Sequence, residues 1–141
     1  MSRIVVGLDG SESAVGALRW AAELAQNHGD ELFVVTVFPP PEVVGVPGAR
    51  WPVERVEETE QRAREQQRRW LSDILSEEYP DLELIADVRM GRAAERLLEA
   101  AKEAELLVVG ARGRGGFTGL LLGSVSMQCV THAEVPVTVV H

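Results

Sequence analysis

Short apolar runs alternate with longer helical patterns along the whole chain, and this alternation predicts the fold. The runs are rich in Val, Ile and Leu, as expected for strands that are buried on both faces of a sheet. Between them, apolar residues recur every three or four positions, which is typical of helices with one buried face. The runs that we expect to form strands are residues 3–8, 32–38, 82–88, 106–109 and 135–140.

Four helical patterns separate these strands. The first ends at His28-Gly29, because glycine readily takes the left-handed conformation of a helix C-cap. The second covers residues 53–78, with Glu and Arg side chains paired four positions apart, and we expect its apolar stripe to pack inward from Val53 onward. The third pattern follows Gly91 and the fourth begins at Ser124.

Strands that alternate with helices predict an α/β fold, in which a five-stranded parallel sheet carries four helices on both faces. We find no internal repeat, so we expect residues 1–141 to form a single domain. Ligands of such sheets bind beyond the carboxyl ends of the strands, where the strand order switches. Because Asp9, Val37 and Gly110 lie at or near strand ends, we expect them to face one crevice.

The segment from Gly110 to Ser126 reads as a strand end that opens into an anion-binding loop. Five further glycines precede Ser124 and let backbone amides approach a ligand closely. Ser124 and Ser126 occupy the positions of an N-cap and a first-turn residue, so we expect their hydroxyls to converge with the free helix amides. Arg112 and Arg114 add positive charge. These residues predict a phosphate site, without distinguishing ATP from another phosphate-bearing ligand.

Composition and charge narrow the class of protein. The formal net charge of −8 argues against a nucleic-acid-binding protein, whose affinity needs many cationic contacts. No apolar stretch approaches the length of a membrane span, and a strand-like run follows Met-Ser-Arg directly, so we expect a cytoplasmic protein without membrane contact. The single cysteine, Cys129, agrees with a reducing compartment, and we interpret it as a small buried hydrophobe on the last helix.

Several motifs of nucleotide chemistry are missing. The chain has neither a P-loop nor a glycine triplet after the first strand, where it reads Gly7-Leu8-Asp9-Gly10-Ser11. A nucleophile elbow and zinc-ligand spacing are also missing. Asp9 is the only obvious carboxylate near the expected crevice, and no general base is evident, so we expect slow hydrolysis or none. An alternative role for Asp9 is to cap the first helix.

The spacing Gly110-x-x-Gly113, nine residues, Gly123-Ser124 resembles the motif of ATP-binding members of the universal stress protein family. The resemblance covers the whole chain and includes Asp9 with the Gly-Ser that follows it, and the final Val-Pro-Val strand. It implies a Rossmann-like fold of the adenine nucleotide alpha hydrolase type. It also implies ATP as the ligand, with Mg²⁺ as its candidate companion ion.

The same resemblance assigns roles within the site. Asp9 and Val37 would lie at the base and ribose, with Gly110 against the ribose. Arg112 and Gly113 would lie along the phosphates, and the residues from 123 to 126 would close over the phosphate tail. The full set assigned to the nucleotide is Gly7, Leu8, Asp9, Val37, Val109, Gly110, Arg112, Gly113, Arg114, Gly123, Ser124, Val125 and Ser126.

Two segments are candidates for contacts with other protein chains. The last run, Val135-Pro-Val-Thr-Val-Val140, leaves unpaired backbone groups at a sheet edge, and in the resembled family this strand commonly builds a homodimer. The alternative is an ordinary edge strand that Pro136 blunts. Residues 39–52 are rich in proline and predict a long loop that bears on the choice of an unidentified protein partner.

The resemblance therefore implies an ATP-binding regulator in the stress response. Two alternatives remain. One is a weak ATPase or nucleotidyl-transferring enzyme, and the other is an interaction module of the same fold without a ligand.

Overall fold

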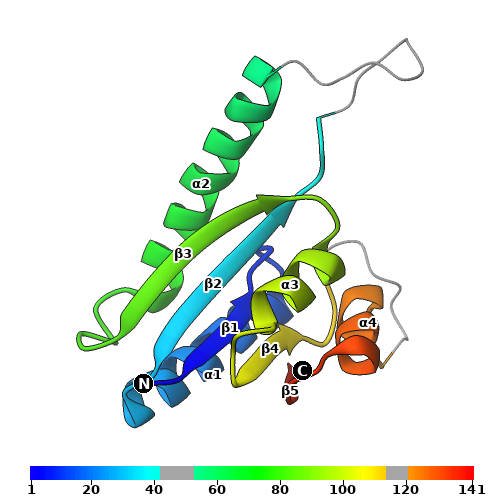
Figure 1. Ribbon diagram of the computed structural model, residues 1–141. Helices are drawn as coiled ribbons and strands as arrows, with labels where there is room; N and C mark the ends of the chain where they lie inside the picture. Colours follow the sequence, from blue (N-terminus) through cyan, green and yellow to red (C-terminus); the bar gives the residue numbers. More distant parts are fainter. Residues whose placement is uncertain (42–52, 114–120) are drawn as a thin grey trace.

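The computed structural model describes residues 1–41, 53–113 and 121–141, in which a parallel sheet lies between two pairs of helices (Figure 1). The strands of this part of the chain are β1 (Arg3–Gly7), β2 (Glu31–Phe38), β3 (Glu83–Met90), β4 (Leu106–Gly110) and β5 (Val137–Val140). The helices are α1 (Glu12–His28), α2 (Val53–Leu75), α3 (Ala93–Ala101) and α4 (Ser124–His132). Strands and helices alternate throughout, which confirms the predicted α/β fold.

The strand order places a switch point in the middle of the sheet. The order is β3-β2-β1-β4-β5, and every neighbouring pair is parallel. In the centre, Val5 of β1 lies opposite Phe33 of β2 on one side and Leu107 of β4 on the other. The chain runs outward from β1 through β2 to β3, and then crosses back to β4. The predicted crevice therefore belongs at the carboxyl ends of β1 and β4.

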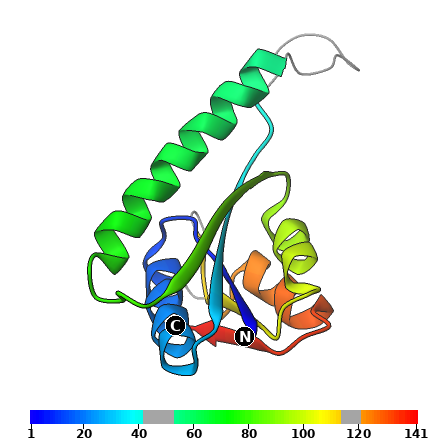
Figure 2. The same ribbon diagram turned by 60° about the vertical axis from the view of Figure 1, so that its left-hand side comes forward.

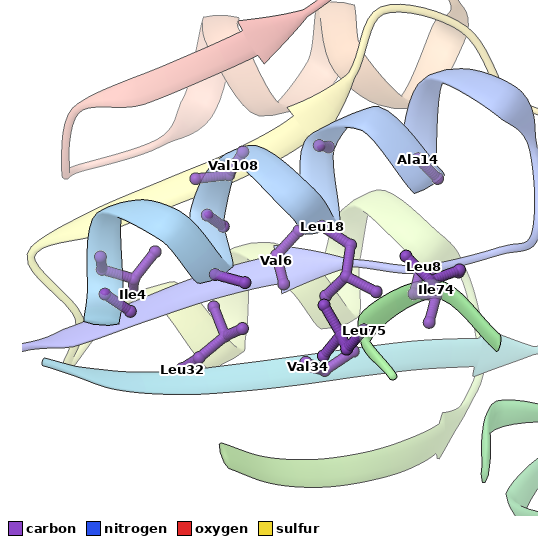
Figure 3. Packing of buried hydrophobic residues seen from close by; sticks show 14 residues of the cluster. Ile4, Val6, Leu8, Ala14, Leu18, Leu32, Val34, Ile74, Leu75 and Val108 are labelled. Carbon is purple, nitrogen blue, oxygen red and sulfur yellow. The ribbon is translucent and has the colours of Figure 1, made fainter. Parts of the chain in front are cut away.

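Helices α1 and α2 cover one face of the sheet, and α3 and α4 cover the other (Figure 2). Successive side chains of a strand point to opposite faces. Val6 and Val34 accordingly pack with α1 and α2, whereas their neighbours Val5 and Val35 pack with α3. Figure 3 shows the first of these clusters, where Leu18 of α1 lies over the strands. The two cores hold the strand ends, and thus the crevice, in place.

Helix α2 differs from its predicted form at both ends. It stops at Leu75 rather than near residue 78, because Ser76 has a φ of 49° and leaves the helical conformation. Val53 is 67% exposed and does not pack inward, contrary to the prediction. The buried residues of the helix all lie at or beyond Gln67, and its first half extends past the sheet (Figure 2). Trp70, in the second half of the helix, packs against the core.

The ends of other elements differ from the predicted ends by one or two residues. Strand β3 extends to Met90, and β5 begins at Val137 rather than at residue 135. The predicted C-cap is confirmed, since Gly29 has a φ of 71°. Residues 42–52, most of the predicted loop, lie outside the described residues. Within the described ranges, no helix combines the length and the apolar character that crossing a membrane requires.

Candidate functional site

A cleft opens at the carboxyl ends of β1 and β4, where the strand order reverses. The strand ends, the first turns of α1 and α3, and the start of α4 form its walls. Asp9, Val37 and Gly110 all line it, as the strand order led us to expect. The described residues that line the cleft are Gly7, Leu8, Asp9, Ser11, Ala14, Val35, Val37, Ala93, Leu97, Val109, Gly110, Arg112, Gly113, Val125 and Ser126.

One part of the cleft is an apolar slot between β2 and α3. Val35 and Val37 line it from β2, and Ala93 and Leu97 line it from α3. Gly7, at the end of β1, lets α3 approach the sheet, because a Cβ atom at this position would lie 3.0 Å from Cδ1 of Leu97. The slot presents aliphatic side chains to a ligand, which suits a flat ring system.

The Asp9 carboxylate lies beside this slot, at the turn from β1 into α1. Gly10 has a φ of 83°, a conformation that favours glycine, and this turn brings Ser11 back toward Asp9. Oδ1 of Asp9 accepts hydrogen bonds from the amide of Ser11 at 2.9 Å and from its hydroxyl at 2.6 Å. Ser11 is the N-cap of α1, and its hydroxyl accepts a bond from the amide of Ala14. Asp9 therefore orients the capping residue instead of capping the helix itself.

The glycines of the motif are explained by close packing. At Gly110, a Cβ atom would lie 2.6 Å from the carbonyl carbon of Ser13 and 2.7 Å from the amide nitrogen of Ala14. The end of β4 thus rests on the backbone of α1, with no room for a side chain. At Gly113, a Cβ atom would lie 3.1 Å from Oδ2 of Asp9. The turn at residues 110–113, which carries the first two glycines of the motif, therefore lies directly against the Asp9 carboxylate.

The start of α4 differs from the prediction. Gly123 is the N-cap, without a side-chain capping bond, and Ser124 is the exposed first residue of the helix. Ser126 is 2% exposed, and its hydroxyl donates to the carbonyl oxygen of Ala111 at 2.8 Å. The carbonyl oxygen of Gly123 lies 3.0 Å from the same hydroxyl. The Ser126 hydroxyl therefore does not meet the free helix amides as predicted, because it is bonded to carbonyls at the exit of β4 and the start of α4. This hydroxyl fastens α4 to the sheet.

Gly123 contributes to the same attachment. Its amide donates to the carbonyl oxygen of Ala111 at 2.6 Å, and a Cβ atom would lie 3.3 Å from Cα of Arg112. Gly123 and Ser124 are therefore placed at the start of α4, next to the turn that lines the cleft, but neither is among its lining residues. Arg114, also predicted as a site residue, lies outside the described residues.

Sequence reasoning missed part of the apolar wall. Val35 precedes Val37 by two positions on the same strand, so the alternation of side chains could have placed both on one face. Ala93 and Leu97 lie one helical turn apart at the start of a helix that follows a strand end, a position that also faces the crevice. Across residues 1–41, 53–113 and 121–141, no three His, Cys, Asp or Glu side chains gather as a metal site would require.

Comparisons with known proteins agree with this architecture. The family model described as the universal stress protein family matches residues 1–141. A universal stress protein of Mycolicibacterium smegmatis is 39% identical over 142 residues, which cover 97% of this chain and 45% of the relative. The chain thus spans about half the length of the curated relatives it matches.

Solved structures show the same fold. Universal stress protein UspA from Lactobacillus plantarum superimposes with a TM-score of 0.76 at 23% identity, over 99% of this chain and 97% of that one. A universal stress protein solved in complex with cAMP gives a TM-score of 0.63 at 25% identity, over 99% and 96% of the two chains. Sequence and fold lead to the same assignment over the full 141 residues: the chain belongs to the universal stress protein family.

Proposed function

We propose that this chain binds an adenine nucleotide, ATP in particular, and acts as a nucleotide-dependent regulator of the stress response in the cytoplasm. The observation that carries the proposal is the meeting of an apolar slot, the Asp9 carboxylate and the glycine turn of the motif in one cleft. The likeness to a universal stress protein solved with cAMP supports an adenine nucleotide as the ligand class. We further propose that residues 1–141 function as one domain.

The proposed placement follows the chemistry of the cleft walls. The base lies in the apolar slot, and the ribose lies near Asp9 and Gly110. The phosphates follow Arg112 and Gly113 toward residues 123–126, where the helix N-terminus favours negative charge, and we propose that Arg114 adds positive charge to the site. Mg²⁺ accompanies the phosphates as their counterion.

The first test is a search for bound nucleotide in protein purified without added ligand. We expect wild-type protein to release ATP on denaturation, as identified by chromatography. Gly113→Val should release none, because the new side chain meets the Asp9 carboxylate and fills the turn. Gly16→Ala is the matched control, since its Cβ would lie 3.6 Å from the nearest atom, Cγ1 of Val140, and should leave the nucleotide in place.

Calorimetry and thermal melting complete this test. ATP at a hundredfold excess over Kd should stabilise the wild-type fold by about 2.7 kcal/mol. AMP and cAMP, titrated in parallel, rank the preference among adenine nucleotides. Wild-type protein that carries no nucleotide and also ignores all three in calorimetry would overturn the proposal.

We also propose that two copies pair through β5. The sheet order leaves β5 at one edge. The carbonyls of Pro136 and Val140 accept bonds from the amides of Leu107 and Ala111, so the alternation of the ladder turns the amides of Val137 and Val139 toward the open edge. Such an edge is a template for a second strand.

Two substitutions at one position separate edge pairing from packing. Val139→Pro removes an outward amide and the valine side chain, whereas Val139→Ala removes only most of the side chain. We expect wild type and Val139→Ala to sediment as dimers and Val139→Pro as a monomer. A wild-type monomer in analytical ultracentrifugation would contradict the pairing and leave nucleotide binding unaffected.

A further inference from the structure

A buried glutamine lies among the inward-facing residues of α2. Gln67 is 2% exposed, whereas the other buried residues of this helix, Ile74 and Leu75, are apolar. Its side-chain nitrogen donates to the carbonyl of Asp87 at 2.8 Å and lies 3.3 Å from that of Val34. A buried amide without partners is unfavourable, so the bond to Asp87 anchors the side chain to β3, with the Val34 carbonyl of β2 close by.

The same nitrogen also reaches Thr36. It lies 3.1 Å from Oγ1 of Thr36, which in turn donates to the carbonyl oxygen of Leu8 at 2.8 Å. A threonine hydroxyl has a single proton. Because Oγ1 accepts a bond from Gln67, its own proton is directed to Leu8. Thr36 is 6% exposed, so water offers little competition for these bonds.

Leu8 is the residue that enters the cleft just before Asp9. Its amide donates to the carbonyl of Val35 at 2.9 Å, and its carbonyl accepts from Thr36. Both polar groups of this residue are therefore bonded to β2. The bond to the Leu8 carbonyl comes from a side chain, the hydroxyl of Thr36, and this hydroxyl in turn accepts a bond from Gln67.

Neither Thr36 nor Gln67 lines the cleft. Thr36 lies between Val35 and Val37 on β2, and those two side chains face the slot on the side of α3. The alternation of the strand places Thr36 on the opposite face, under α2. The contact that links these two polar side chains to the residue before Asp9 is the bond from Thr36 to the Leu8 carbonyl.

We propose that Thr36 and Gln67 are positioning residues that couple α2 to the nucleotide site. The inference rests on the proposed nucleotide binding and adds a route for its regulation. A displacement of α2 withdraws Gln67 from Thr36, loosens the Leu8 carbonyl and shifts Asp9, which lowers nucleotide affinity. The first half of α2 extends past the sheet (Figure 2), so the bonds of Gln67 lie where the helix meets the sheet.

Paired substitutions test the coupling. Thr36→Val removes the hydroxyl at nearly constant shape, whereas Thr36→Ser keeps it. Gln67→Met removes the amide from the buried position, and Gln66→Met makes the same change at the exposed neighbouring position. We expect Thr36→Val and Gln67→Met to raise the Kd for ATP about fivefold in calorimetry, the loss typical of one neutral hydrogen bond. The two controls should stay within about twofold of wild type.

A second readout uses nucleotide-free protein. Amide hydrogen exchange of residues 8–11 should be faster in Thr36→Val and Gln67→Met, and unchanged in Thr36→Ser and Gln66→Met. Variants that melt lower but keep wild-type affinity and wild-type exchange would show a purely structural role and overturn the inference. If wild type binds no nucleotide, the proposed function fails, and the exchange rates still decide whether α2 controls the Leu8 backbone.

Discussion

The hydroxyl of Ser13, in the first turn of α1, contacts the backbone of Arg112 at both of its polar atoms. It accepts a hydrogen bond from the amide of Arg112 at 3.2 Å and donates one to its carbonyl oxygen. The two residues are 99 positions apart in the chain. One side chain at the start of the first helix thus holds the turn that follows β4.

Replacement of Ser13 should weaken nucleotide binding more than it weakens the fold. In Ser13→Ala the Arg112 backbone loses both contacts, while the exposed site lets water take their place. We expect a roughly threefold to tenfold rise in the Kd for ATP in calorimetry, the range for a neutral hydrogen bond. Ser72→Ala, at an exposed position of α2, is the control and should bind like wild type. Equal affinity in all three proteins would contradict this role of Ser13.

Two glycines of the structure should respond to alanine in opposite directions. Gly110→Ala places a Cβ atom within 2.7 Å of backbone atoms of α1, so the strand end must move, and we expect a loss of about 2 kcal/mol in the free energy of unfolding. Gly16→Ala, inside α1, meets only ordinary contacts and should gain about 0.5–1 kcal/mol. Urea denaturation measures both values. A neutral Gly110→Ala would show that β4 and α1 separate easily.

The two serines at the start of α4 should differ in stability. Ser126→Ala removes a buried hydroxyl that donates to Ala111, and we expect a loss of about 1 kcal/mol. Ser124 is exposed, so Ser124→Ala should change the free energy of unfolding by less than about 0.5 kcal/mol. Thermal unfolding of the nucleotide-free variants makes the comparison. The reverse order would restore the predicted capping role of Ser124.

Through Cys129, the free energy of unfolding should fall as the pH rises into the alkaline range. The thiol is fully buried, which confirms the sequence interpretation, and burial raises its pKa from 9.0 to about 11. The unfolded chain therefore loses this proton first as the pH rises. The resulting stabilisation is fully present below pH 9 and is lost as the pH rises through about 11.

A comparison with Cys129→Ala isolates this contribution, because all other groups titrate in both proteins. We expect the advantage of wild type in urea denaturation to be constant up to about pH 9 and to shrink above it. At neutral pH the native thiol should also resist alkylation until the protein unfolds, as checked by mass spectrometry. Rapid alkylation of the native protein would show that the last helix opens readily.

The order and type of the elements could be predicted because each depends on local pattern. Continuous apolar runs mark the buried strands and helical spacing of apolar residues marks the helices, so both appear where expected to within a few residues. The predictions failed where local pattern and packing disagree. Val53 continues the apolar stripe of α2, but it is exposed, because it belongs to the first half of the helix, which extends past the sheet.

The position of the candidate site was also accessible from the sequence. The carboxyl ends of parallel strands share one edge, so the ends of the first, second and fourth strands had to meet. The glycine spacing marked the same edge independently. The apolar wall from α3 was missed, since Ala93 and Leu97 look like any other core positions of a helix.

By itself, then, the sequence determined the α/β order, the parallel sheet and the edge where a ligand belongs. Only the tertiary structure decided which polar group meets which. Ser126 bonds to Ala111 instead of meeting the free helix amides, and Gln67 reaches Leu8 through Thr36. These bonds join segments that lie far apart in the chain, and their partners are set by strand register and helix packing. Periodicity reports the face on which a side chain lies, but not the atom that it meets there.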